Sequence, residues 1–409
     1  MSGPLSKYRV LDLSTIGMGP YATQILGDLG ADVVKVEEPV TGDMMRAQAP
    51  GRHDGMSPLF LSLNRSKRSI VLDLKSPEGR SVLMRLAKVS DVLITNIRPD
   101  ALQRLGIDHR SVCEESPRIV YCGLVGFGSD GPYAGRAAFD DLIQGASALA
   151  GLHIRANGAP QLVPAWIADQ TVGLVAAHTV LAALLEREQT GLGQYVEVPM
   201  FESMVQFVLT PHLCAHTFQP PTQAPGYKRL FERKVYATED GFLCGGPYTL
   251  SQWHRFLEMT GHTEMVASGR FNSQLDVANR IDELYAVFAK ALLTGTTAEW
   301  LVKLQAADIA AMPVHTLESV QDDSHLKATG FFVDTEHPTE GLIRTMRVPT
   351  RWSRSDPQPS RQAPNLGEHS EQILSEIGLS SQEIQELFRS GASASSRVKQ
   401  TQPGEPCDG

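Results

Sequence analysis

One aspartate stands out in the sequence because it lies at the beginning of a long apolar run. The segment is AWIADQTVG, residues 165–173, and the carboxylate belongs to Asp169. At a helix start, an aspartate side chain accepts hydrogen bonds from backbone amides that lack a partner inside the helix, and the helix dipole keeps the carboxylate ionised by lowering its pKa. An ionised carboxylate in a fixed position can also act as a nucleophile. The local sequence leaves capping and catalysis both open.

A glycine-containing turn and several cations could bind an anion. STIGMGP, residues 14–20, places two glycines between a predicted strand and a predicted helix, where free amides favour an anion. Glycine at such a turn is equally explained by backbone geometry. Lys75, Arg98 and Arg104 follow further strands, and the carboxyl ends of parallel strands are where ligands bind in open α/β sheets. Each cation alone could be an ordinary surface charge, but their shared position favours a phosphorylated ligand.

The elements that would position these residues alternate between strand and helix. The predicted strands are residues 8–14, 32–39, 69–75, 91–97, 118–128 and 195–200. A helix should begin after Ser76, with Pro77 at its first position, and residues 171–188 read as a buried helix. This alternation predicts an α/β fold with a mostly parallel sheet covered on both faces.

Composition predicts a soluble, folded protein of two domains. The chain has 409 residues and a net charge of −9, and it contains no basic run, which argues against a nucleic-acid partner. The five cysteines form no CxxC pair, so we expect reduced thiols in the cytoplasm and no metal site. We find no signal peptide and no apolar stretch long enough to cross a membrane, so no membrane partner is expected.

A second region follows a proline- and glycine-rich stretch. Residues 219–226, QPPTQAPG, read as a linker, and VYATEDGFLCGG predicts a hairpin that turns at Asp240 and Gly241. Helices are expected near residues 250–260, 276–293 and 297–307. These elements predict a smaller α+β domain.

Several ordered blocks resemble the class III CoA-transferase family, which includes formyl-CoA transferase, carnitine CoA-transferases and 2-methylacyl-CoA racemases. The resemblance runs from about residue 8 to about residue 388. Its blocks are VLDLSTIGMGP, ILGDLGADVVKVEEP, GDMMR, SLNRSKRSIVLDLKSPEG, DVLITNIRPDALQRLGI, YCGLVGFGSDGPYAGRAAFDDLIQGASALAG, ADQTVG, LEREQTGLGQYVEVPMFESM, PVHTLESVQDD and LGEHSEQIL.

The resemblance implies a Rossmann-like large domain built from both chain ends, a small α+β domain between them, and a homodimer of two interlocked subunits. We therefore expect the large domain and linker at residues 1–224, the small domain at 225–330, and the return linker and remainder of the large domain at 331–390. Residues 391–409 are small, polar and proline-containing, which predicts a disordered tail.

The resemblance also implies an enzyme, an acyl-CoA:carboxylate CoA-transferase with Asp169 as nucleophile. Asp169 would attack the thioester of a donor acyl-CoA to give a mixed anhydride, and CoA thiolate would then form an aspartyl-CoA thioester. An acceptor acid would reverse these steps and leave as its CoA ester. Coenzyme A is then a substrate, and no tightly bound cofactor is expected. The donor could be succinyl-CoA or another small acyl-CoA, and the acceptor a mono- or dicarboxylic acid.

The family's CoA contacts transfer residue by residue, with two departures. They fall on Gly17, Met18, Leu72, Asp73, Lys75, Asn96, Ile97, Arg98 and Arg104, and Asp140 matches an acidic position beside the thioester. Where formyl-CoA transferase has an arginine, this chain has Glu38, so that Arg46 or Arg68 would have to make the adenine-side contact. The GGP at 245–247 is too short for that enzyme's glycine-rich loop, which argues against formate and oxalate.

Two alternatives come from other classes. A racemase of the same superfamily would use a histidine where this chain has Phe139, so one proton-transfer partner is missing. A catalytically idle CoA-binding protein is the other alternative, and the presence of Asp169 beside the glycine turn argues against it.

Overall fold

The computed structural model describes residues 3–222 and 234–396. The chain divides into two compact units. The first comprises residues 1–150, 162–208 and 330–409, and the second comprises 151–161 and 209–329. The second segment of the first unit ends at residue 208, before the domain limit expected at residue 224. That residues 151–161 belong to the second unit was not predicted from the sequence.

The first unit contains a seven-stranded sheet in the order β12-β3-β2-β1-β4-β5-β6. The strands are β1 (Arg9–Leu13), β2 (Asp32–Glu37), β3 (Lys67–Leu72), β4 (Val92–Thr95), β5 (Val120–Val125), β6 (Tyr195–Pro199) and β12 (Ser393–Ala394). Six pair in parallel and β12 pairs antiparallel with β3. The expected α/β fold with a mostly parallel sheet is confirmed. The order of β1 to β6 is that of doubly wound folds, with a switch point between β1 and β4.

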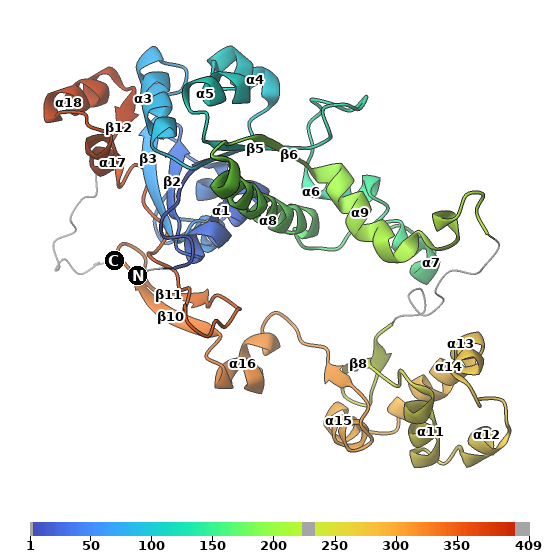
Figure 1. Ribbon diagram of the computed structural model, residues 1–409. Coiled ribbons are helices and arrows are strands. Elements are labelled where there is room, and N and C mark those ends of the chain that lie inside the picture. Colours follow the sequence, from blue (N-terminus) through green and yellow to red (C-terminus); the bar gives the residue numbers. More distant parts are fainter. Residues whose placement is uncertain (1–2, 223–233, 397–409) are drawn as a thin grey trace. The chain divides into compact units, whose positions relative to one another are not determined.

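Helices cover both faces of this sheet (Figure 1). One layer holds α3 (Pro77–Lys88), α4 (Pro99–Leu105), α5 (His109–Glu115), α17 (Ser370–Glu376) and α18 (Ser381–Ser390), whose apolar residues form one core cluster with the strands. The other layer holds α1 (Met18–Asp28) and α8 (Ile167–Thr190). Ser76 caps α3 with Pro77 at its start, as predicted, and Ser380 caps α18 in a capping box.

The unit's remaining elements are peripheral to the sheet. They are η1 (Met44–Ala47), α2 (Pro58–Leu63), α6 (Asp140–Ala146), most of α9 (Met200–His212), and the antiparallel pair β10 (Phe332–His337) and β11 (Gly341–Met346).

Helix α8 packs closely against α1 along a face of small residues. A Cβ at Gly173 would collide with the Met18 carbonyl and approach Tyr21, so glycine is required for this contact. The helix ends at Gly191 in the left-handed conformation, at φ 77°. Length and composition alone would let α8 cross a membrane, but its buried face packs on α1, β5 and β6 as a core helix does. The predicted all-round burial is wrong, because Leu185 is 68% exposed.

The segment after α18 is ordered for several residues. Asp73 N donates to Ala392 O at 2.9 Å, and Ser393 Oγ donates to Val71 O at 2.6 Å. These bonds fix β12 at the sheet edge, so the predicted disorder of residues 391–409 is wrong for 391–396. The remaining residues of that predicted tail lie outside the described ones, as do residues 223–226 of the predicted linker.

The second unit is α+β. A three-stranded antiparallel sheet, β7 (Tyr236–Ala237), β8 (Phe242–Gly245) and β9 (Ala311–Pro313), includes the predicted hairpin at Asp240 and Gly241. Its other elements are α7 (Leu152–Asn157), η2 (Cys214–Thr217), α11 (Leu250–Met259), α12 (Thr263–Ala267), α13 (Gln274–Asn279), α14 (Ile281–Leu292), α15 (Thr297–Ala306), η3 (Ser319–Asp322) and α16 (Ser324–Ala328). Its core is aromatic, with Trp253, Phe256 and Phe288 fully buried.

Candidate active site

A cleft of about 1300 Å³ opens at the carboxyl ends of the sheet's strands, where doubly wound folds bind ligands. Loops after β1, β4 and β5 form its walls, and the first turn of α8 contributes Asp169. The cleft brings together eight of the predicted site residues, namely Gly17, Met18, Asn96, Ile97, Arg98, Arg104, Asp140 and Asp169. The predicted anion site and the predicted nucleophile therefore share one cavity.

Three predicted contacts do not line this cleft. Leu72 is 1% exposed within β3 and belongs to the core. Asp73 accepts the Lys75 amide at 2.9 Å, which forms a turn at the end of β3. A CoA contact at these residues stays a prediction.

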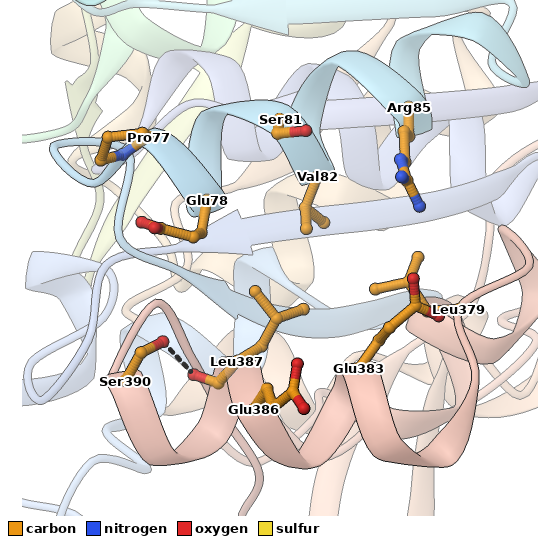
Figure 2. Close-up of a pocket in the computed structure, with 10 residues that line it drawn as sticks. All are labelled: Pro77, Glu78, Ser81, Val82, Arg85, Leu379, Glu383, Glu386, Leu387 and Ser390. Carbon is orange, nitrogen blue, oxygen red and sulfur yellow. Dashed lines mark hydrogen bonds between the residues drawn. The ribbon is translucent and has the colours of Figure 1, made fainter.

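A second hollow, of about 560 Å³, lies between α3 and α18 (Figure 2). Glu78, Glu383 and Glu386 line it together with Arg85. Three carboxylates against one guanidinium disfavour an anion such as CoA. None of the predicted site residues lines this hollow, so it is not the candidate active site.

The backbone of the turn after β1 is fixed by side chains from three other segments. Asn96 accepts the Thr15 amide at 3.0 Å and donates to the Thr15 carbonyl at 2.8 Å. Asp43 accepts the Ile16 amide at 3.2 Å, and Ile16 has a φ of 75°, which is strained for a β-branched residue. Lys35 donates to the Ser14 carbonyl at 2.9 Å. The turn is therefore held rigidly where α1 begins.

A buried charge cluster lies under this turn. Lys67 Nζ is 3.0 Å from Asp12 Oδ2 and Lys35 Nζ is 2.8 Å from Asp43 Oδ2, with all four side chains fully buried. Burial alone would raise the pKa of Asp12, but Lys67 and Lys35 hold it well below its usual value. Burial lowers the pKa of Lys67 to about 8. Sequence reasoning missed this cluster, although charged residues inside apolar strands were a visible signal.

Gly17 lets the Asp169 carboxylate approach the turn. A Cβ at residue 17 would collide with Asp169 Oδ2. Glycine is therefore required by the close approach of a side chain, which explains one of the two glycines in the turn.

Asp169 does not cap its helix. Helix α8 begins at Ile167 after Trp166, so Asp169 is the third residue of the first turn, and the helix has no side-chain cap from Trp166. Asp140 Oδ1 instead accepts the amides of Ala168 and Asp169, at 2.8 and 3.0 Å. Of the two roles that the local sequence left open for Asp169, capping does not apply, because a carboxylate from α6 occupies these amides.

The pKa of Asp169 is raised, whereas the sequence predicted a lowered one. Burial raises it first and the negative charge of Asp140 adds to the effect, so that the pKa of Asp169 lies at about 6. The carboxylate is still largely ionised at neutral pH. It is more basic than an exposed aspartate and hence a stronger nucleophile.

Neither proposed substitute for the adenine-side arginine is free. Arg46 is 3% exposed and bonds Glu37 through two nitrogens, each at 2.7 Å. Arg68 is 4% exposed and bonds Asp32 and Glu376. Both guanidiniums are themselves buried and form ion pairs, so the suggestion that Arg46 or Arg68 replaces that contact is wrong. Glu38 itself lines the cleft.

The loop after β5 supplies cleft residues that sequence reasoning did not single out. Arg136 lines the cleft with its guanidinium carbon 4.4 Å from the Tyr133 ring centroid. Glu197 Oε1 accepts the Ser129 amide at 2.9 Å and anchors the base of this loop. The basic residue in the block GPYAGR was the signal for Arg136.

Phe139 is exposed at the mouth of the cleft, immediately before α6. A phenyl ring has no titratable proton, so this position offers no acid or base. Within residues 3–222 and 234–396, no cluster of three or more His, Cys, Asp or Glu side chains could hold a metal ion.

Comparison with known proteins gives concordant matches. The model of CoA-transferase family III matches residues 5–370. The chain is similar to human succinyl-CoA:glutarate CoA-transferase, with 30% identity over 91% of this chain and 86% of the relative. It is similar to formyl-CoA:oxalate CoA-transferase of Rhodopseudomonas palustris, with 30% identity over 97% of this chain and 99% of the relative.

Solved structures agree with these matches. The crystal structure of Rv3272 from Mycobacterium tuberculosis has a TM-score of 0.80 at 29% identity, covering 91% of this chain and 99% of that one. A CAIB/BAIF family protein from Brucella suis has a TM-score of 0.79 at 29% identity, covering 92% of this chain and 100% of that one.

Proposed function

The chain belongs to CoA-transferase family III, and from this membership we propose that it moves CoA from a donor acyl-CoA to an acceptor carboxylic acid through Asp169. One observation carries the role of Asp169. Its carboxylate lies in the cleft against Gly17, and among the described residues no side chain or amide donates a hydrogen bond to it. A half-buried carboxylate without such a donor is available to attack a substrate.

The first half-reaction forms an aspartyl-CoA thioester. An Asp169 carboxylate oxygen attacks the donor's thioester carbon, the C–S bond breaks, and CoA leaves as thiolate. The thiolate then attacks the Asp169 carbonyl carbon of the mixed anhydride, and the donor acid leaves as a carboxylate. The acceptor carboxylate attacks the aspartyl thioester, and the same steps in reverse release its CoA ester and free Asp169. Both leaving acids are carboxylates, so the exchange is nearly balanced in energy.

The residues around Asp169 support this chemistry. Its pKa of about 6 makes the carboxylate nucleophilic yet ionised at neutral pH. Arg98 and Arg104, in the same cleft, are suited to the phosphates of CoA, because guanidinium groups bind phosphate oxygens in pairs. The predicted contacts of Gly17, Met18, Asn96, Ile97 and the β3 turn with CoA belong to this proposal.

The substrates that we favour are a small acyl-CoA such as succinyl-CoA and a mono- or dicarboxylic acceptor. A succinyl-CoA:glutarate CoA-transferase and a formyl-CoA:oxalate CoA-transferase are each 30% identical to this chain. The short GGP at 245–247 disfavours the second pair, as argued from the sequence. The location that we propose is the cytoplasm, and the assembly is a homodimer.

A donor–acceptor matrix combined with a chemical trap tests the proposal. Purified enzyme is incubated with each of several acyl-CoA donors and acceptor acids, with both formyl-CoA and oxalate included, and the CoA esters are separated by chromatography. Enzyme with donor alone is treated with hydroxylamine and digested, and mass spectrometry should find a hydroxamate at Asp169.

The control is Asp141→Asn, which removes an exposed carboxylate near the cleft and should trap normally. Asp169→Asn should trap nothing and transfer nothing. Full activity in Asp169→Asn, or a hydroxamate at another residue, would overturn the role of Asp169.

The racemase alternative is tested with the same preparation. Because Phe139 offers no proton, 2-methylacyl-CoA incubated in deuterated water should keep its α hydrogen. Rapid deuterium uptake would favour racemization.

A further inference from the structure

We propose that Asp140, held by Gln144, is a positioning residue that keeps the Asp169 carboxylate directed into the cleft by occupying the amino end of α8. The inference rests on the proposed function, because it assumes that Asp169 is the nucleophile. It concerns residues that touch the backbone of the nucleophile and not the reacting atoms.

The hydrogen bonds at the start of α8 can be accounted for completely. A helix leaves its first amides without partners inside the helix. The Ile167 amide donates to Ala165 O at 2.8 Å, and the Gln170 amide donates to Trp166 O at 3.0 Å. The Ala168 and Asp169 amides both donate to Asp140 Oδ1. Every amide of the first turn is satisfied without the Asp169 side chain.

Without Asp140, the Asp169 side chain would be drawn toward the backbone. An acidic residue at the third helical position commonly folds back to accept an amide at the helix start. Two amides without acceptors beside Asp169 would favour that movement, because a buried amide without a hydrogen-bond partner raises the free energy of the folded state. The carboxylate would then leave the cleft and become a weaker nucleophile.

Gln144 fixes Asp140 in this role. It lies one helical turn after Asp140 on α6, on the same face, and is 2% exposed. Its Nε2 donates to Asp140 Oδ2 at 2.6 Å and to the carbonyls of Val163 and Ala165 at 3.1 and 3.2 Å. Its Oε1 accepts the Val163 amide at 2.9 Å. Gln144 therefore connects α6 to the segment that leads into α8.

The charge of Asp140 adds a second, separable effect. Asp140 is the charged neighbour that acts on Asp169 after burial itself. The other charged residues that line the same cleft are Glu38, Arg98, Asp100, Arg104, Arg136 and Glu197. Removing the charge of Asp140 should lower the pKa of Asp169, whereas removing only the hydrogen bonds of Asp140 should leave that pKa unchanged.

The test compares Asp140→Ala, Asp140→Asn and Gln144→Leu with the matched control Asp141→Asn, all as the full chain. Wild-type kcat should rise with pH around a midpoint of about 6. Asp140→Ala should lower kcat by about 10- to 100-fold, change KM for the acyl-CoA less than about threefold, and move the midpoint to lower pH. Asp140→Asn keeps an oxygen for the two amides, so it should retain more kcat than Asp140→Ala while sharing the lower midpoint.

Gln144→Leu keeps the Asp140 charge, so it should lower kcat without moving the midpoint. Asp141→Asn should match the wild type in kcat and in the pH midpoint. Circular dichroism establishes that each variant is folded, and if Asp140→Ala does not fold, the other two variants decide the matter. Wild-type kcat and midpoint in folded Asp140→Asn and Gln144→Leu would overturn the inference. If wild type itself forms no hydroxamate at Asp169, the proposed function fails and not this inference alone.

Discussion

At the scale of single residues, the cleft combines two carboxylates with different tasks. Asp140 is satisfied on both oxygens, by two amides and by Gln144. Asp169 accepts no such bond from the residues that the structure describes and has a raised pKa, at about 6. The environment therefore separates two chemically identical groups into a helix cap and the carboxylate that we propose as the nucleophile.

The raised pKa predicts that ionised Asp169, the proposed nucleophile, destabilises the fold at neutral pH. A carboxyl whose pKa is higher in the folded than in the unfolded state stabilises the fold at low pH, and this stabilisation is lost as pH rises through the folded pKa. Above pH 6 the folded protein must hold a half-buried charge. Asp169→Asn should therefore raise the free energy of unfolding at pH 8 by about 1–3 kcal/mol.

Urea unfolding at pH 8 and at pH 5 measures this effect. The difference in free energy of unfolding between Asp169→Asn and wild type should be smaller at pH 5 than at pH 8. Asp141→Asn should show no comparable increase in the free energy of unfolding. An Asp169→Asn protein less stable than wild type at pH 8 would contradict the prediction.

Gly17 provides a second prediction at the residue scale. Its backbone is compatible with alanine, at φ −105° and ψ −68°, so Gly17→Ala should fold. The added methyl group would displace Asp169 Oδ2, and misplacing a reacting group by about 1 Å reduces kcat about 100-fold. Steady-state kinetics measure this loss. The control is Gly145→Ala, because a Cβ there would meet no atom within 4 Å among the described residues beyond its chain neighbours and its own helix backbone, and it should keep wild-type kcat. Equal kcat in the two variants would contradict the role of Gly17.

At the scale of elements, local signals explain which predictions succeeded. The six parallel strands of the large sheet, the Ser76 cap and the hairpin at Asp240 depend on neighbouring residues, and they were predicted correctly. The cap of α8 could not be predicted, because its acceptor, Asp140, lies 28 residues before Ala168. No local pattern states which distant carboxylate will reach a helix end.

Contacts between residues far apart in the sequence also explain the other incorrect predictions. Arg68 forms ion pairs with Asp32 on β2 and with Glu376 on the C-terminal α17. Only the fold brings these residues together. The candidate cleft was predicted in outline because strand ends in a parallel sheet converge on one edge. Its details depend on loops whose path the sequence does not specify.

Asn96 provides a prediction at the element scale. Its amide joins the loop after β4 to the turn after β1 through both polar atoms of the Thr15 backbone. Asn96→Ala should lower the free energy of unfolding by about 1–3 kcal/mol, because two backbone groups lose their partner. The freed turn would also present Gly17 and Met18 less rigidly, so KM for the acyl-CoA should rise.

Urea unfolding and steady-state kinetics measure the two effects of Asn96→Ala. The comparison is Asp100→Ala, which removes another polar side chain from the same cleft wall without a described bond to the turn. Unchanged free energy of unfolding and KM in Asn96→Ala would show that the Asn96 hydrogen bonds to Thr15 have no role.

At the scale of the whole molecule, α8 presents an apolar surface. Leu174 and Leu185 are 52% and 68% exposed on α8, and Phe207 on α9 is 52% exposed. Large apolar side chains that are exposed on a helix are typical of a surface that another subunit covers. This surface supports the proposed homodimer, and light scattering after gel filtration should give twice the mass of 44.6 kDa.

Interlocked subunits make a sharper prediction than dimerisation alone. Two chains that pass through each other cannot separate unless at least one of them unfolds, whereas subunits that only touch through surfaces such as Leu185 exchange whenever the interface opens. Mixing tagged and untagged dimers should therefore give no hybrid dimer under native conditions, and hybrids should form only after unfolding in denaturant and refolding. Leu185→Glu distinguishes the two arrangements, because a charge on an apolar interface should speed exchange of surface-held dimers but leave interlocked dimers without hybrids. Hybrid dimers that form without denaturant in the wild type would show that the chains are not interlocked.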